Sequence, residues 1–523
     1  MPQLYPTHIG PARRHRTRLP NLNVAMAATI KPLKIAILGG GPSSFYCASR
    51  ILSRLPHSSP EGQNVQVHVY DRLWAPHGLV RYGVAPDHPE VKVSIFSTAL
   101  FSYTEFILFY FIVCFVSQCL TFFGQNCTHK FNETAKDPRF RFFGNVNVGD
   151  TPSFPHALHL PLRALFPHYT HLIISNGATL PVILPQLGNA STPALSLVHW
   201  YTAHPSQPPP PRLEAMPHMT LLGHGNVSLD IARMMFSPPE RLAPLDLPEH
   251  VVEKISNTSV RHISIVSRRG PAEAAFTAKE LRELLTLPRA AMIPIPEELL
   301  VPPPNATRQQ KRILDLLRKG STTKTGETSY TWSLKFFRSP TKVTQHTNEY
   351  TTIEYDVNQL DAQKRAVPTG EMDMQRTHGV VGSIGYRSEP IEPAWFNGGL
   401  GRTRNVIGRV FNEENRRVQG VYSSGWASNG AKGVLATTMM DAYSVAETLL
   451  TDHFQGETNA EPPVEILNSD PRPGGPPEVE HSTARVISYD DWIRIDEEEI
   501  RRGQARKKER ERMVWADVIK FLS

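Results

Sequence analysis

Two glycine-rich turns in the sequence have the composition of loops that bind the pyrophosphate of a dinucleotide. The first contains Gly39 and Gly41, which follow the apolar run 34–38 and precede a helical pattern over 45–55. Gly39 permits a tight turn, and Gly41 lets the backbone approach a phosphate that the N-terminus of the next helix attracts. Ser44 takes the third position of the pattern and is small enough for close packing of helix on strand.

An acidic residue completes this first site. Asp71 follows the alternating strand pattern 65–70, where its carboxylate can accept hydrogen bonds from ribose hydroxyl groups. Asp71 lies further from Gly39 than the roughly twenty residues usual in dinucleotide-binding motifs, because the helix and loop between them are long. Another apolar strand is expected at 171–175. The N-terminal part therefore has the strand, turn and helix order of a doubly wound α/β unit.

The second turn, GHGNV at 223–227, precedes a helical pattern over 229–236 but differs at its ribose end. Where an NAD site would place an acidic residue after the next strand, this chain has Arg268 and Arg269. Two guanidinium groups suit a dianionic 2′-phosphate, which a carboxylate would repel. The sequence therefore predicts NADP at this turn. We assign His224 to the turn's backbone and not to catalysis.

The composition limits the class of protein. A chain of 523 residues with 40% hydrophobic and 20% charged residues is globular, which excludes wholesale disorder, a collagen-like fibre and a polytopic transporter. Its four cysteines form no CxxC pair and no zinc-binding spacing, so neither a dithiol redox site nor a disulfide scaffold is indicated. Two dinucleotide sites without a dithiol indicate hydride transfer from NADPH to a flavin, which passes the electrons onward.

Longer strings resemble the adrenodoxin reductase family, which comprises the mitochondrial ferredoxin–NADP reductases. GLVRYGVAPDHPEVK at 78–92 and AFTAKELRE at 275–283 are the most specific, and the resemblance extends from about Lys34 to the C-terminus. The remaining strings are RFFGNV at 141–146, GHGNV at 223–227, SRRGP at 267–271, GSIGY at 382–386, SGWA at 424–427 and KGVLATT at 432–438.

The resemblance implies hydride transfer from NADPH to FAD, followed by two single-electron transfers to a [2Fe–2S] ferredoxin. The implied fold is α/β, with two Rossmann-like dinucleotide-binding domains and the NADP domain inserted within the FAD domain. We expect the first part of the FAD domain at 31–180, the NADP domain at 181–375, and the second part of the FAD domain with a C-terminal extension at 376–523.

The resemblance also implies cofactor contacts. Besides Gly39 and Gly41, the expected FAD contacts are Ser43, Asp71, Leu79, Val148, Trp426, Gly433, Val434 and Leu435. The expected NADP contacts are His224, Gly225, Asn226, Val227, Arg268, Arg269, Glu280 and Gly433. Asp71 occupies a position where the family typically has Glu, His224 one where it has Gln, and Ser44 one where it has Gly.

No metal site is expected, and no catalytic acid or base is assigned, because hydride transfer itself requires none. His88 lies in the PDHP turn of the first specific string. It is either a neighbour of the isoalloxazine that relays a proton or a structural residue.

A basic helix is the expected docking site for the ferredoxin, which in this family is acidic. The helical pattern runs over 309–319, and its alternative interpretation is a plain solvated face. The candidate docking residues are Arg308, Lys311, Arg312, Arg318 and Lys319. The net charge of +7 fits an anionic cofactor or an acidic partner and does not indicate nucleic acid. A second charged helix is expected over 497–512, also with a solvated face.

The first thirty residues, 1–30, have the charge pattern of a mitochondrial presequence. They contain Arg13, Arg14, Arg16 and Arg18, and no acidic residue precedes Glu61. The alternative is a disordered basic tail. The expected location is the mitochondrial matrix, with a peripheral association with the inner membrane as a further option.

An apolar insertion interrupts the family pattern. Residues 106–123 carry no charge over eighteen positions, the minimum length of a transmembrane helix, but lack flanking Lys/Arg clusters. The family continues directly from Lys92 to the position of Asn126, so 93–125 is an addition of 33 residues. Its Phe, Ile, Leu, Cys and Ser content is what a thymine-rich non-coding stretch would encode. We favour a retained intron over a membrane anchor.

Two other functions remain open at this point. One is an NADPH-dependent flavin oxidoreductase with a different acceptor, such as a quinone or a partner of the glutamate-synthase type. The other is a membrane-anchored, non-catalytic nucleotide-binding protein, which would follow if the insertion were translated and disrupted the flavin site. Flavin absorbance of the purified protein distinguishes this second alternative from an enzyme.

Overall fold

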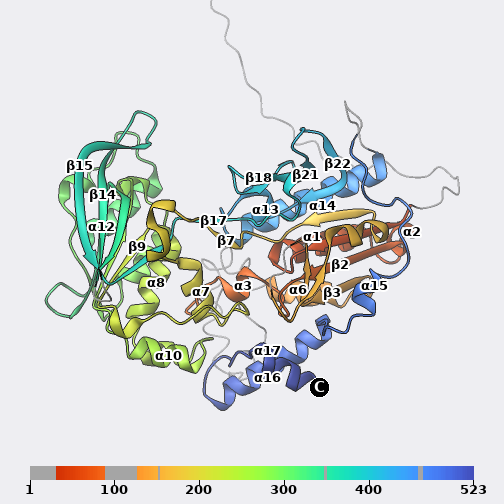
Figure 1. Cartoon of the computed structure of the whole chain (residues 1–523), viewed down its shortest axis with the longest axis horizontal. Coiled ribbons are helices and arrows are strands. Elements are labelled where there is room, and N and C mark those ends of the chain that lie inside the picture. The colour runs from red at the N-terminus through yellow and green to blue at the C-terminus, as the bar shows by residue number, and fades with distance from the viewer. Residues whose placement is uncertain (1–30, 89–126, 151–153, 347–349, 457–462) are drawn as a thin grey trace, which may run out of the picture.

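The computed structural model describes residues 31–88, 127–150, 154–346, 350–456 and 463–523. The predicted presequence 1–30 and the insertion 93–125 lie outside these residues. Figure 1 shows two lobes, one containing β2, β3 and α1 and the other containing β9, α8 and α12. Among the described helices, none has both the length and the apolar composition needed to cross a membrane.

The first lobe is built on a seven-stranded sheet that draws strands from both ends of the chain. In the order of the sheet, the strands are β20 (Asn405–Val406), β21 (Arg409–Phe411), β22 (Arg417–Ser423), β6 (His171–Ile174), β1 (Leu33–Leu38), β2 (Val65–Asp71) and β3 (Phe140–Gly144). The strands from β22 to β3 are parallel, and β20 and β21 add an antiparallel edge. All six residues of β1 are buried, as expected for a central parallel strand covered on both faces.

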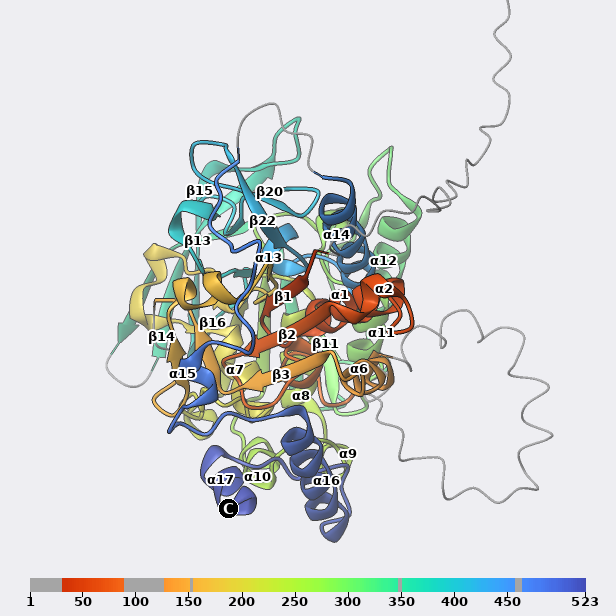
Figure 2. The same cartoon turned by 90° about the vertical axis from the view of Figure 1, so that its right-hand side faces the viewer.

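Helices cover this sheet and position its loops. Figure 2 shows α1, α6 and α14 on the same side of β1, β2 and β3. Phe45, Ile51 and Leu449 belong to the buried apolar core of this lobe. The helices of the lobe are α1 (Pro42–Arg54), α2 (Pro60–Gln63), α3 (Leu79–Tyr82), α6 (Cys127–Ala135), α13 (Trp426–Asn429) and α14 (Leu435–Gln455).

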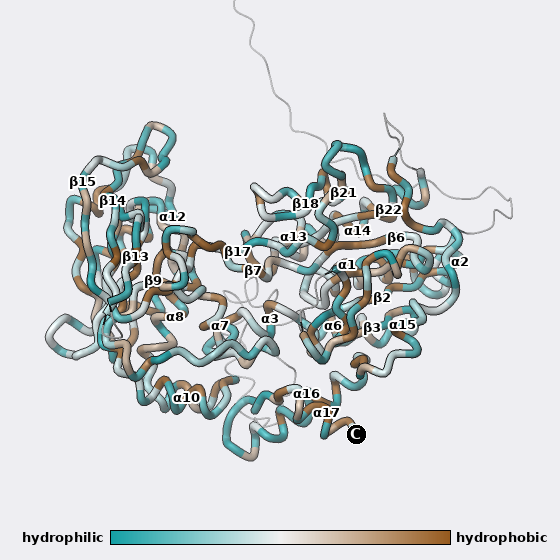
Figure 3. Tube along the Cα trace, viewed as in Figure 1, coloured by the Kyte–Doolittle hydropathy of each residue, from teal (hydrophilic) through white to brown (hydrophobic). Residues whose placement is uncertain are grey.

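The second lobe is built on a six-stranded parallel sheet. Its strands, in sheet order, are β11 (Ala290–Met292), β12 (Tyr330–Lys335), β10 (His262–Val266), β9 (His218–Leu222), β16 (Gly379–Gly382) and β8 (Thr192–Pro193). Its helices are α7 (Ala194–Tyr201), α8 (Asn226–Phe236), α9 (Pro239–Leu242), α10 (Glu249–Ser256), α11 (Ala278–Leu285) and α12 (Arg308–Lys319). Figure 3 shows brown, apolar stretches inside both lobes and teal, polar stretches on the outer loops.

Smaller antiparallel elements complete the described chain. The strands β13 (Arg338–His346), β14 (Tyr350–Leu360) and β15 (Ala366–Thr377) form a three-stranded sheet on the second lobe. β7 (Leu180–Pro181) pairs with β17 (Tyr386–Arg387) between the lobes, as Figure 1 shows. The other short pairs are β18 (Phe396–Asn397) with β19 (Arg402–Thr403), and β4 (Val146–Val148) with β5 (Leu158–Leu160). Residue 375, the expected end of the NADP domain, lies within β15, and the six-stranded sheet continues to Gly382.

The C-terminal region differs from the expected solvated helix over 497–512. It contains α15 (Pro477–Glu480), α16 (Tyr489–Ala505) and α17 (Trp515–Leu522), so the expected helix is wrong beyond Ala505. The chain folds back at this point: Lys507 has a φ of 59°, and Gly503 packs against the backbone of Arg510. A Cβ on Gly503 would lie 2.3 Å from the Cα of Arg510.

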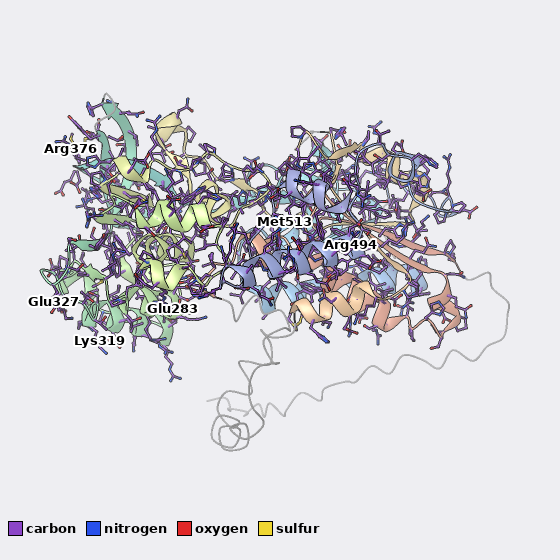
Figure 4. The ribbon with its side chains drawn as sticks, turned by 90° about the horizontal axis from the view of Figure 1, so that it is seen from below. Glu283, Lys319, Glu327, Arg376, Arg494 and Met513 are labelled. Atoms are coloured by element: carbon purple, nitrogen blue, oxygen red, sulfur yellow. The ribbon has the colours of Figure 1, made fainter. Side chains whose placement is uncertain are left out.

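Much of the segment that follows Lys507 is buried between the lobes and is not solvated. Arg81 Nη2 of the first lobe lies 2.8 Å from both carboxylate oxygens of Glu499, which is fully buried. Arg512 Nε donates to Asp246 Oδ1 of the second lobe at 2.7 Å. Figure 4 shows Met513 near the middle of the molecule, where the lobes meet. Glu499 and Arg512, which were expected to face water, therefore pair with charged residues of the two lobes.

Candidate functional site

A cleft opens at the carboxyl ends of β1, β2 and β6 and contains about 1560 Å³ of empty space, including the part open to solvent. Parallel sheets bind ligands at this edge. The lining residues that the sequence predicts as FAD contacts are Gly39, Gly41, Ser43, Asp71, Leu79, Val148, Trp426, Gly433, Val434 and Leu435. The structure thus brings all ten together, from segments up to 396 residues apart (435 minus 39).

The glycine turn before α1 has the geometry of an anion site. Gly39 has a φ of 103°, and a Cβ there would lie 2.6 Å from Ser175 O, so only glycine fits. A Cβ on Gly41 would meet nothing within 4 Å, which leaves open space in the cleft beside it. Gly41 is also the N-cap of α1 and offers no side-chain acceptor to the first backbone N–H groups. These groups and the helix dipole are therefore available to a phosphate.

Asp71 lies at the end of β2 with its carboxylate fixed by backbone donors. Its Oδ2 accepts from Gly40 N at 2.7 Å, and its Oδ1 accepts from Leu73 N at 2.9 Å. Each oxygen retains a second lone pair that a ribose hydroxyl can use. Burial raises the pKa of Asp71 to about 6, although the two backbone hydrogen bonds and Arg72 oppose the shift.

This shift predicts a pH dependence of stability in the flavin-free protein. A carboxyl whose pKa rises from 3.8 to about 6 on folding binds its proton more tightly when folded. The free energy of unfolding that Asp71 contributes should therefore fall by about 3 kcal/mol between pH 4 and pH 6 and stay constant above pH 6. Urea titrations of wild type and Asp71→Asn should show a difference in stability with this profile. A difference that does not change with pH would contradict it.

Other groups in the cleft fit a large cofactor with polar and flat apolar parts. Leu79 and Val434 line it with 39% and 62% of their surface exposed, which suits packing against a ring. Asn176 Oδ1 and Thr179 Oγ1 are buried lining atoms without a hydrogen-bond partner in the described part of the chain. A bound ligand would satisfy both oxygens. The residues present therefore fit FAD.

The second lobe contributes two histidines to the cleft that the sequence did not indicate. His199, on α7, and His204, just after it, stack with their ring centroids 3.7 Å apart and line the cleft. Burial lowers the pKa of His199 to about 4, so this imidazole is neutral near pH 7. Neither histidine belongs to a motif. Only the packing of α7 against the first lobe reveals them, so no signal in the sequence could have identified them.

The second glycine turn repeats the geometry of the first. Gly223 has a φ of 118°, and a Cβ there would lie 2.2 Å from Ser383 O. Gly225 is the N-cap of α8, and a Cβ on it would meet nothing within 4 Å. The ring of His224 is buried with its centroid 5.5 Å from that of Phe336, and burial lowers its pKa to about 4. The backbone of His224, and not its buried ring, is therefore the part that can contact a ligand at the turn.

Arg268 and Arg269 lie at the same sheet edge as this turn, because β10 and β9 are adjacent parallel strands. Arg268 is exposed and Arg269 is half-buried. Within the described residues, neither guanidinium has an ion pair or a hydrogen bond to another side chain. The two cations are therefore free to bind an anion next to the turn.

Glu280 and His88 belong to a cluster of charges between the lobes. Glu280 Oε2, on α11, lies 3.1 Å from Arg233 Nη1 and 3.7 Å from His88 Nε2. Arg233 is fully buried and also pairs with Asp87 at 2.6 Å. His88 Nε2 lies 2.6 Å from Glu283 Oε2. Burial favours neutral His88, yet this hydrogen bond and Glu280 outweigh it and raise the pKa of His88.

The cluster bears on two of the sequence-based expectations. His88 does not appear among the residues that line the cleft, so in this structure it joins the two lobes. The carboxylate of Glu280 already accepts a hydrogen bond from Arg233. The expected contact between Glu280 and NADP stays a prediction.

Comparison with known proteins places this geometry in a family. The chain is 33% identical to the mitochondrial NADPH:adrenodoxin oxidoreductase of Homo sapiens over 92% of its length and 90% of that protein. It is 32% identical to the mouse protein of the same name over 97% of its length and 94% of that protein. The chain belongs to the NADPH:adrenodoxin oxidoreductase family. No model of a known protein family matches it.

A solved structure supports the same conclusion. FprA of Mycobacterium tuberculosis in complex with NADPH superimposes with a TM-score of 0.74 at 27% identity, covering 94% of this chain and 100% of that one. The chain is an FAD-dependent oxidoreductase, and its cofactors are FAD and NADP(H). The family, the two-domain α/β fold and both cofactors predicted from the sequence are confirmed. Individual cofactor contacts stay predictions.

Proposed function

We propose that this chain transfers electrons from NADPH through FAD to a [2Fe–2S] ferredoxin of the adrenodoxin type. The observation that carries the proposal is the pair of dinucleotide turns on facing lobes, with α7 of the second lobe lining the cleft of the first. The names of the relatives specify adrenodoxin as their acceptor. The lack of a CxxC motif also favours an acceptor outside the chain.

Each glycine turn has one binding role in this proposal. The N-terminus of α1 holds the FAD pyrophosphate, and Asp71 accepts hydrogen bonds from the ribose. The N-terminus of α8 holds the NADP pyrophosphate, and Arg268 and Arg269 bind the 2′-phosphate. Bound FAD supplies the chemistry by accepting a hydride and releasing electrons singly. Gly433 lines the cleft without a side chain, so flavin and nicotinamide can both approach it.

The basic side of α12 is the proposed ferredoxin docking site. Ile313, Leu314 and Leu317 of this helix are buried, so its charged residues face outward. Arg318 pairs with Glu297 and Asp315. Arg308, Lys311, Arg312 and Lys319 are exposed and have no ion pair within the described residues. Figure 4 shows Lys319 on the outer part of the second lobe. Free surface cations of this kind steer an acidic partner.

Reversing two of these charges should weaken docking and leave flavin chemistry intact. We expect Lys311→Glu with Arg312→Glu to raise the KM for ferredoxin by about tenfold at low salt, with the effect shrinking as salt is added. Ferricyanide reduction by NADPH should not change. Lys507→Glu with Lys520→Glu is the control, since it alters net charge equally at two other exposed positions. Equal loss of both activities would contradict a docking role.

The acceptor is tested by NADPH-driven reduction of cytochrome c with and without added ferredoxin. We expect little reduction without ferredoxin and rapid reduction with it. Equal rates in both samples would contradict the proposal and favour a different acceptor, such as a quinone.

We also propose that residues 1–30 direct the chain to the mitochondrial matrix. The relatives are named as mitochondrial, and the four arginines of the first thirty residues support import. Import into isolated mitochondria should require residues 1–30. Import of a chain lacking them would contradict this role.

We propose a retained intron as the origin of residues 93–125. The support is the composition of this insertion, together with relatives that match more than 90% of the chain and so include sequence on both sides of it. Sequencing the mature transcript tests it. Reads that span codons 93–125 in mature message would contradict the proposal and favour a translated segment.

A further inference from the structure

The turn that carries Arg268 and Arg269 is held by a sheet outside the two dinucleotide folds. This sheet consists of β13, β14 and β15, and hydrogen bonds join it to the residues that follow β10. Arg338 N, at the start of β13, donates to Ser267 O at 2.8 Å. Phe337 N donates to Arg269 O at 3.3 Å. The backbone on both sides of Arg268 is therefore attached to the segment that leads into β13.

The remaining carbonyl of the turn is bound by a side chain of β14. Asn358 Nδ2 donates to Arg268 O at 3.0 Å and to Ser339 Oγ at 2.8 Å. Asn358 N also donates to Phe337 O at 2.9 Å. Asn358 is only 5% exposed. Its amide therefore links the carbonyl of Arg268 to β13 with both of its donors.

The backbone is irregular at two positions beside this contact. The register of β14 against β15 shifts between Asp356, which faces Met372, and Asn358, which faces Pro368, so the extra residues lie in β15. Phe337 has a φ of 56°, which is strained for a bulky residue. A Cβ on Gly270 would lie 2.6 Å from Phe337 Cζ, so the phenyl ring packs directly on the residue after Arg269. Strain of this kind is often found at ligand sites.

The two arginines need such an anchor because their charges repel each other. Neither has an acidic partner within the described residues. Asp373 of β15 is paired with Arg338, at 2.7 Å. Without a backbone restraint, two adjacent cations would separate into water, and binding an anion would require bringing them together again.

We propose that Asn358 is a positioning residue for coenzyme selectivity, which holds the Arg268–Arg269 turn in the conformation that binds the 2′-phosphate of NADP(H). Asn358 acts through the carbonyl of Arg268 and does not itself touch the coenzyme. The proposal rests on the proposed role of Arg268 and Arg269. It adds that the three-stranded sheet serves NADP recognition from behind the turn.

The test compares NADP⁺ with NAD⁺ on the FAD-loaded full-length protein by displacement titration calorimetry. Asn358→Ala should weaken NADP⁺ binding by about tenfold and change NAD⁺ binding less than about twofold, because it removes a restraint on the 2′-phosphate site alone. Asn358→Asp keeps the size of the side chain but loses both donors, and its effect should be at least as large. Gln359→Ala, at the exposed neighbour, should change neither affinity.

The outcomes separate the two proposals. If Arg268→Ala with Arg269→Ala keeps the preference for NADP⁺, the proposed function of the arginines is wrong. If that variant loses the preference while both Asn358 variants keep it, the role of Asn358 is wrong. Equal weakening of NADP⁺ and NAD⁺ in the Asn358 variants would also overturn it, because a purely structural role affects both coenzymes.

Discussion

Replacing both Arg268 and Arg269 with alanine should abolish the preference for NADPH over NADH. The two guanidinium groups are free at the end of β10, beside the turn at the N-terminus of α8. Hydrogen bonds to a charged group contribute about 1.5–3 kcal/mol each. Losing one from each arginine should lower kcat/KM for NADPH by about a thousandfold. The value for NADH, which has no 2′-phosphate, should change less than about threefold.

Steady-state kinetics with both coenzymes and ferricyanide as acceptor measure this effect independently of ferredoxin. Arg54→Ala with Arg163→Ala is a suitable control, because it removes two exposed arginines elsewhere on the surface. Its kcat/KM values should match wild type. An unchanged ratio of NADPH to NADH in the Arg268 and Arg269 variant would show that another group binds the 2′-phosphate.

Gly41→Val should yield a folded protein that does not retain FAD. The position has an ordinary φ of −83°, and a Cβ on it would meet nothing within 4 Å. The polypeptide itself therefore has space for a side chain. The isopropyl group would occupy the side of the cleft where the pyrophosphate approaches the N-terminus of α1. We expect flavin affinity to fall by about a hundredfold or more.

Flavin absorbance per polypeptide, with circular dichroism as a check of folding, measures this outcome. Gly398→Val is the matched control, since it is exposed, lies outside the cleft and has equally open space around its Cβ position. It should remain yellow. A Gly41→Val protein with a full complement of FAD would contradict the proposed path of the pyrophosphate.

Local patterns predict the parts of the site that depend on consecutive residues. Gly39 and Gly41 precede a helix, Asp71 ends a strand, and Arg268 follows another, so each role follows from strand, turn and helix order. The structure confirms those elements. Trp426 and Gly433 needed the family resemblance, because no local rule places a segment near residue 430 beside a turn near residue 40.

Other features depend on packing between distant segments. His199 reaches the cleft only because α7 lies between the lobes. Asn358 contacts Arg268, 90 residues away in the sequence, only through the packing of β14 beside the turn after β10. Glu499 was expected to be solvated, since charged side chains are rarely buried without partners. Its partner Arg81 is 418 residues away, and a helical pattern contains no information about so distant a contact.

The central claim is that NADPH reduces a flavin bound in this cleft, which then reduces a [2Fe–2S] ferredoxin. Anaerobic stopped-flow absorbance of the purified protein tests it most directly. NADPH should bleach the flavin far faster than NADH does, and oxidised ferredoxin added afterwards should restore the yellow colour. A colourless protein, or a flavin that NADPH does not bleach, would contradict the account, as would reduced flavin that ferredoxin leaves unchanged.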